Sequence, residues 1–85
     1  MSQQAILEQM SAFFVARRRE LPLEAFMAES PQSLIKDSLE LVEFLVHLEE
    51  TLGWCIEIGE VGEYASKSFA ELAAIAASRF GHSDA

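Results

Sequence analysis

The chain has 85 residues, enough for one folded domain spanning 1–85 and too few for two. Hydrophobic residues make up 51% of it, which excludes the composition of a disordered protein, where hydrophobicity is low and net charge is high. The net charge of −8 repels phosphate backbones and anionic lipids, so we expect neither nucleic acid nor membrane as a partner.

Acidic residues are concentrated between residues 37 and 63, where eight Asp and Glu residues occur without any Lys or Arg. A surface of this sign favours basic patches on other proteins, mainly because it raises the rate of encounter. The alternative interpretation is that the charge only keeps a small protein in solution.

Several absences indicate a cytoplasmic protein. The first residues show no basic segment followed by an apolar run, and no apolar stretch approaches the roughly 20 residues of a membrane span. Cys55 is the only cysteine, so the chain forms no internal disulfide. Because it lies between Trp54 and Ile56, we expect it to be a small core residue rather than a nucleophile.

Residues 3–19 are predicted to form the first helix, with Arg17 to Arg19 in its last turn and Leu21 and Pro22 ending it. Its apolar residues recur at the spacing of one buried helical face. That face consists of Ile6, Met10, Phe13 and Phe14, with Leu7 at its edge.

Residues 20–36 are predicted to be a long connection that packs across the bundle, because they are too apolar for a solvated linker. We expect a helical turn around 23–28, broken by Ser30 and Pro31. The apolar residues of the connection are Leu23, Phe26, Met27, Leu34 and Ile35.

The second helix carries the clearest local signals. Asp37 to Glu40 fit a capping box, in which Asp37 accepts a backbone N–H and Glu40 reaches back to the Asp37 amide. Gly53 marks the end of the helix. Its inner stripe is predicted to be Leu41, Phe44, Leu45, Leu48 and Leu52.

Residues 56–58 alternate like a strand, but the chain offers no second strand, so we predict an extended loop. A short helix is expected over 59–65, weakened by Gly59 and Gly62.

A second capping box, from Ser68 to Glu71, is predicted to open the last helix, which Gly81 ends before a frayed tail over 82–85. The predicted fold class is therefore all-α, with three main helices, a short extra helix, a long first loop and an ordered core over about 3–81. The inward residues of the last helix are predicted to be Leu72, Ile75, Ala76 and Phe80.

Signatures of an enzyme are missing, so the sequence predicts no catalytic residue and no metal site. His47 and His82 are far apart in the chain, and Cys55 stands alone. No glycine-rich phosphate loop occurs, and no Ser or Cys has a recognisable base partner.

Two segments together resemble one known family. Asp37, Ser38 and Leu39 open an acidic amphipathic helix about half-way along the chain, in the segment LIKDSLELVEFLVHLEETLG. The later segment 56–72 reads IEIGEVGEYASKSFAEL, which is similar to a pattern of Ile-x-Ile, a short third helix, Lys-Ser/Thr and a capped last helix. With the first helix and the long loop included, nearly the whole chain resembles the acyl carrier proteins of fatty-acid and polyketide synthesis, whose fold is a four-helix bundle.

The resemblance implies a freestanding carrier that catalyses nothing itself. In the family, the serine of the Asp-Ser-Leu motif receives 4′-phosphopantetheine from coenzyme A through a separate phosphopantetheinyl transferase. Here that serine is Ser38, and Asp37 would support the transfer by helping to hold metal and coenzyme. The arm would carry acyl or polyketide-type intermediates as thioesters between acyl-transferring, condensing or ligase enzymes of one pathway, with the chain acting as a monomer.

The resemblance also places a partner-binding face on the second helix, where apolar residues give contact area and carboxylates pair with Arg or Lys of a partner. For Leu39 and Val42, packing at the edge of the core is the alternative. The face implied is Leu39, Val42, Glu43, Val46, His47 and Glu50.

Near Ser38 the chain departs from the family pattern. Most such carriers have a glycine two residues before the Asp, whereas Ile35 and Lys36 precede Asp37 here, which points to a specialised partner. Two alternatives stay open: an aminoacyl or peptidyl carrier of a nonribosomal pathway, and an adaptor that keeps the carrier fold for protein binding but is never modified.

Overall fold

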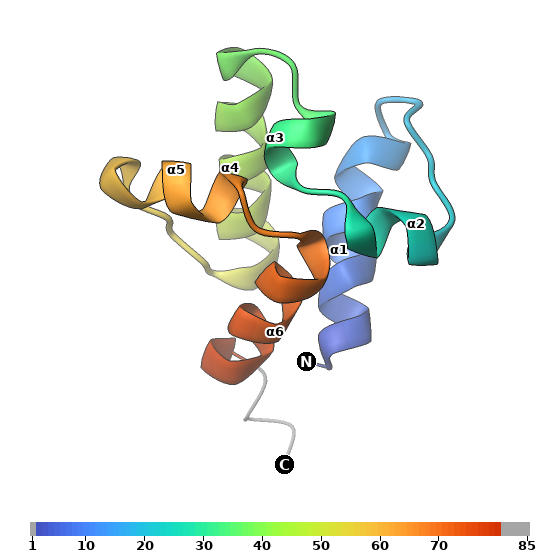
Figure 1. The fold of residues 1–85 in the computed structure, drawn as a ribbon. Coiled ribbons are helices and arrows are strands. Elements are labelled where there is room, and N and C mark those ends of the chain that lie inside the picture. The colour runs from blue at the N-terminus through green and yellow to red at the C-terminus, as the bar shows by residue number, and fades with distance from the viewer. Residues whose placement is uncertain (1, 81–85) are drawn as a thin grey trace.

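The computed structural model describes residues 2–80, and this part of the chain is built of α-helices without a strand (Figure 1). The predicted all-α class is confirmed. Four of the helices have eight residues or more, and two are shorter. In chain order they are α1 (Gln3–Val15), α2 (Leu23–Ala28), α3 (Pro31–Leu34), α4 (Ser38–Leu52), α5 (Ile58–Ala65) and α6 (Phe69–Phe80).

Phenylalanine rings from four helices form the centre of the core. The ring of Phe14 in α1 lies 5.6–5.8 Å, centroid to centroid, from those of Phe26, Phe44 and Phe69. The rings of Phe26 and Phe69 stack with their centroids 4.1 Å apart. Because these rings come from α1, α2, α4 and α6, their burial joins segments that are distant in the sequence.

Helix α1 buries the face predicted for it but ends at Val15, earlier than expected. The amide of Arg18 donates to the Val15 carbonyl at 3.0 Å, and the amide of Arg19 donates to the Phe14 carbonyl at 2.8 Å. Arg18 itself adopts a left-handed backbone with φ of 62°. This is the hydrogen-bond pattern of a Schellman motif, formed here without glycine, and it reverses the chain before Pro22.

The long connection packs on the core as predicted, and it contains one more helix than expected. The helical turn over 23–28 is confirmed as α2, with Phe26 buried. Pro31 then starts the short helix α3, because a proline at the first helical position has a suitable φ and lacks an N–H that would be unsatisfied there. The Ser33 hydroxyl accepts from the Ser30 amide at 2.9 Å and closes this turn.

Helix α4 has the predicted ends and the predicted inner stripe. Asp37 is the N-cap, and Gly53 ends the helix in the left-handed conformation, with φ of 72°. Phe44 and Leu48 are each 1% exposed. The flanking stripe residues Leu41, Leu45 and Leu52 are half-buried.

The chain between α4 and α5 is non-helical, and Cys55 is exposed there, so its prediction as a core residue is wrong. Successive side chains of an extended segment point to opposite sides. Trp54 is buried and Ile56 is half-buried, which turns Cys55 between them toward solvent. The predicted loop extends only to Glu57, because Ile58 already begins α5.

Helix α6 begins at the second predicted capping box and packs along α1. The Ser68 hydroxyl accepts from the Glu71 amide at 3.1 Å, and the Glu71 carboxylate accepts from the Ser68 amide at 3.1 Å. These bonds, first that from the Ser68 amide and then that from its hydroxyl, lower the pKa of the Glu71 carboxyl. Gly81, the tail over 82–85 and the side chain of Phe80 lie outside what is described.

Candidate functional site

Ser38 is the first residue of α4, and its side chain is exposed. The residue before it, Asp37, caps the helix: Asp37 Oδ1 accepts from the Glu40 amide at 2.8 Å. Since the cap bond is made by Asp37, the hydroxyl of Ser38 is not needed to hold the helix start. The serine that the sequence singled out is therefore accessible for chemistry.

The start of α4 suits a negatively charged group on Ser38. The first amides of an α-helix have no carbonyl partner within the helix, and the aligned peptide dipoles make this end positive. A phosphate ester on Ser38 Oγ would lie beside these donors. Helix α4 has 15 residues, and its aligned peptide dipoles are equivalent to roughly half a positive charge at this end.

A hollow of about 240 Å³ opens next to Ser38. Lys36 lies on its rim, where its Nζ donates to the Ser33 carbonyl at 3.0 Å. Most of the wall is apolar, so an apolar part of a group attached to Ser38 would have a surface to lie against. The other lining residues are Pro31, Gln32, Ile35, Asp37, Leu41 and Ala65.

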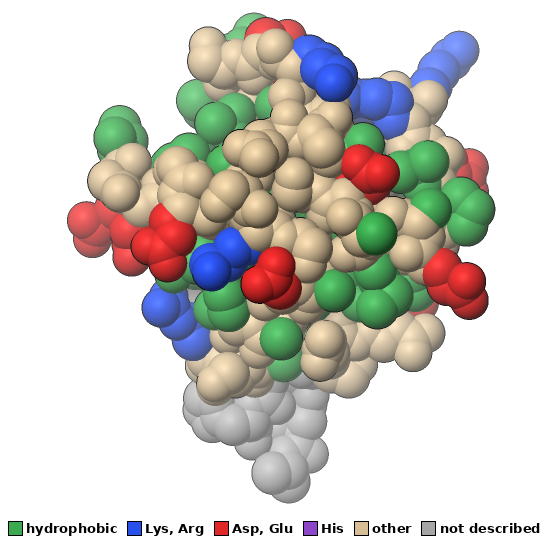
Figure 2. All heavy atoms as spheres, in the orientation of Figure 1, with side chains coloured by type: hydrophobic (Ala, Val, Ile, Leu, Met, Phe, Trp, Pro, Cys, Tyr) green, Lys and Arg blue, Asp and Glu red, His purple; other side chains and the backbone are tan. Residues whose placement is uncertain are grey.

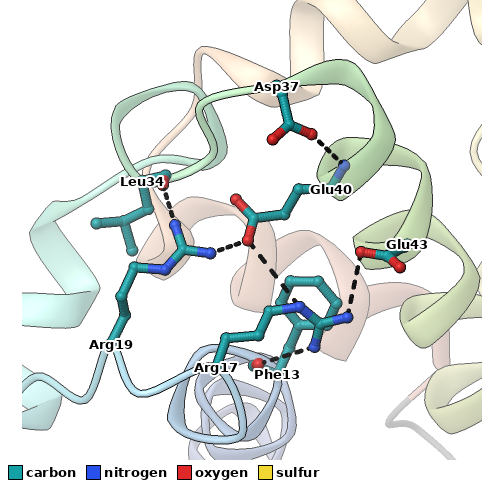
Figure 3. Close-up of polar contacts among 7 residues, drawn as sticks. All are labelled: Phe13, Arg17, Arg19, Leu34, Asp37, Glu40 and Glu43. Carbon is teal, nitrogen blue, oxygen red and sulfur yellow. Dashed lines mark hydrogen bonds and ion pairs between the residues drawn. The ribbon is translucent and has the colours of Figure 1, made fainter.

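Beneath the first turn of α4, two arginines from the end of α1 meet two carboxylates (Figure 3). Arg19 donates to the Glu40 carboxylate, whose nearer oxygen also lies 4.0 Å from Arg17 Nε. Arg17 in turn donates to Glu43 Oε1 at 3.4 Å. The predicted return of Glu40 to the Asp37 amide is wrong, because charge-assisted bonds to arginine are stronger than a bond to a neutral amide.

The charges of the molecule are unevenly distributed. In Figure 2, basic side chains gather at the end where α1 finishes and α4 begins, and acidic side chains gather at the edge over α5, with further basic side chains just below them. The two arginines pair with Glu40 and Glu43. Within residues 2–80 the exposed Glu49 and Glu50 have no such ion pair, so the free acidic charge of α4 lies in its second half.

Three apolar side chains on the outer face of α4 point to solvent. Leu39 is 69% exposed, Val42 is 54% exposed and Val46 is 45% exposed. Packing at the edge of the core does not account for Leu39 and Val42 at such exposure. Together with Glu50, these residues form a mixed apolar and acidic surface on the helix that begins at Ser38.

Two residues lie differently from what the sequence suggests. His47 is at the edge of the outer face, where its Nε2–H donates to the Gln9 carbonyl at 2.7 Å and its ring packs 5.5 Å from that of Phe13. This side chain is therefore used within the fold. Ile58, absent from the predicted face, is 92% exposed at the start of α5. Because α5 already begins at this residue, the helix turns the Ile58 side chain outward.

Within residues 2–80, no cluster of His, Cys, Asp and Glu is arranged to hold a metal ion, and no helix is long and apolar enough to cross a membrane. No protein-family model matches the sequence, and neither curated proteins nor solved structures show a significant similarity to it.

Proposed function

We propose that the protein is a freestanding acyl carrier that holds its cargo as a thioester on 4′-phosphopantetheine attached to Ser38. The observation that carries this proposal is the exposed Ser38 hydroxyl at the first position of a long helix that Asp37 already caps. The likeness of the motif and of the following segment to carrier proteins supports it. We propose further that the carrier acts as a monomer in the cytoplasm and is not itself an enzyme.

Attachment would join Ser38 Oγ to the phosphorus of the pantetheine half of coenzyme A. The bond from that phosphorus to the nucleotide half breaks, and a transferase removes the hydroxyl proton. The new phosphodiester keeps one negative charge, which the amides at the start of α4 favour. The apolar hollow beside Ser38 would receive part of the arm. Asp37, with its second oxygen free of the cap bond, would assist the transferase.

Partner enzymes would dock on the outer face of α4. Leu39, Val42 and Val46 offer apolar contact area that a bound partner would shield from water. The carboxylate of Glu50 would attract a basic partner. The same geometry would serve an aminoacyl or peptidyl carrier. An adaptor that is never modified would bind partners through this face, with no group attached to the Ser38 hydroxyl.

The test incubates the protein with coenzyme A and a broad-specificity phosphopantetheinyl transferase, and measures its intact mass. We expect an increase by one phosphopantetheinyl group. The reaction must contain a reductant, because the exposed Cys55 thiol would otherwise exchange with the disulfide of oxidised coenzyme A, forming a mixed disulfide and releasing one coenzyme A thiol. A protein that stays unmodified under these conditions would be an adaptor rather than a carrier.

Reversing the charge of Glu50 should slow loading. Glu50→Lys replaces an exposed carboxylate of the docking face with an ammonium group, and exposed charges act mainly through encounter. We expect kcat/KM to fall roughly fivefold at low salt, corresponding to about 1 kcal/mol for an exposed pair, and the difference to shrink at high salt. Glu24→Lys makes the same charge change on α2 and serves as the control. Equal loss in both variants would show that only net charge matters.

A further inference from the structure

Arg19 is bonded to both sides of the segment that presents Ser38. One guanidinium nitrogen donates to the Leu34 carbonyl at 2.5 Å, at the end of α3, and another donates to the Glu40 carboxylate in the first turn of α4 (Figure 3). Asp37 and Ser38 lie between these two contacts in the sequence. A single side chain therefore spans the segment that would have to enter the active site of a transferase.

The backbone at the end of α1 holds Arg19 in place. The amide of Arg19 donates to the Phe14 carbonyl in the Schellman closure, and its guanidinium carbon lies 5.5 Å from the centroid of the Phe14 ring. Phe14 is 1% exposed and lies at the centre of the core. Arg19 is thereby anchored to the buried core rather than free at the surface.

The carboxylate that Arg19 binds is well enclosed. The side chain of Glu40 is 15% exposed, and Arg17 Nε lies 4.0 Å from the same oxygen. Water screens such a pair less than it screens an exposed one, so the contact restrains α4 more strongly than a surface ion pair would. The Glu40 amide is held at the same time by Asp37, so both ends of this residue are restrained.

We propose that Arg19 is a positioning residue for the modification of Ser38: it fixes the segment between α3 and α4 in the form that the transferase recognises. This inference rests on the proposed carrier function. Without Arg19, the segment samples several conformations, and the transferase binds only the fraction in which Ser38 is correctly presented. The apparent affinity falls by that fraction, while the chemical step after binding is unchanged.

The experiment measures loading kinetics for Arg19→Ala, Arg19→Lys and Glu40→Gln, with Arg18→Gln as the control. Arg18 neighbours Arg19, is exposed and forms no hydrogen bond or ion pair through its side chain to residues 2–80. For Arg19→Ala we expect KM for the carrier to rise about tenfold and kcat to stay within about twofold. Arg19→Lys should recover only part of the loss, since an ammonium lacks the planar fork that reaches both partners.

Two further measurements separate positioning from loss of stability. The Ile35 and Glu40 amides donate to the Pro31 carbonyl and to Asp37 Oδ1, and their hydrogen exchange should accelerate in Arg19→Ala. Exchange in the core of α1 and α6 should stay unchanged. Ile75→Ala, which weakens the half-buried face of α6, should lower the unfolding midpoint without raising KM. Combining Arg19→Ala with Glu40→Gln should raise KM by less than the product of the two single effects, because both variants lose the Arg19–Glu40 ion pair.

The outcomes distinguish the two proposals. If the wild-type protein is loaded but Arg19→Ala shows the KM of the Arg18→Gln control, the positioning role is wrong and the carrier function stands. If KM rises equally in Ile75→Ala, the effect is one of stability, and the positioning role is again wrong. If the wild-type protein takes up no group at all, the carrier function fails and the role of Arg19 in loading fails with it.

Discussion

Replacing Ser38 with alanine should abolish the uptake of phosphopantetheine and leave the stability of the fold nearly unchanged. The hydroxyl oxygen is the atom to which the arm would be bonded, so alanine offers no acceptor. The exposed side chain contributes little to packing, and Asp37 retains its bond to the Glu40 amide. We expect the free energy of unfolding to change by less than about 0.5 kcal/mol.

Intact mass after loading, together with urea denaturation, measures both parts of this expectation. Ser66→Ala is a matched control, because Ser66 is also an exposed serine and lies at the end of α5. This control should still be loaded. If Ser38→Ala gains the same mass as the wild type, the arm is attached elsewhere and the site is wrong.

The second large effect is expected in the core. Phe44 is 1% exposed, and its ring lies 5.2 Å from Phe13, 5.6 Å from Phe14 and 5.9 Å from Phe69, centroid to centroid. Truncation to alanine leaves a cavity among these rings and should cost about 3–5 kcal/mol. A small domain has only about 5–15 kcal/mol of total stability, so Phe44→Ala should lose a large part of it.

Val46→Ala, two residues away on the outer face, is the matched control for Phe44→Ala. Val46 is 45% exposed, so its truncation should cost less than about 1 kcal/mol. Midpoints of urea denaturation, compared at equal slope, give both values. An equal loss in the two variants would mean that Val46 lies in the core and that the outer face of α4 is wrongly assigned. The proposal that partners dock on Leu39 and Val42 would then be wrong.

The elements that could be predicted from the sequence are those fixed by local chemistry. Asp37 and Gly53 mark the two ends of α4 because a capping carboxylate and a left-handed residue act within one helical turn. The buried face of α1 follows from helical spacing alone. The capping box that begins at Ser68 likewise predicts the start of α6.

The features that could not be predicted depend on contacts between distant residues. Glu40 lies 21 positions from Arg19, and no local pattern shows that its carboxylate leaves the capping box for that partner. The early end of α1 depends on Arg18, a residue without the conformational freedom of glycine. The exposure of Cys55 follows from Trp54 packing inward, which is decided by the shape of the core rather than by the composition of the loop.

The central claim is most directly tested by locating the arm on the loaded protein. Trypsin cleaves after Lys36 and Lys67, and no Lys or Arg lies between them, so Ser38 falls in one peptide, 37–67. Fragmentation of that peptide under reducing conditions should place a single phosphopantetheinyl group on Ser38. A peptide that stays unmodified, or that carries the group on another residue of 37–67, would contradict the account.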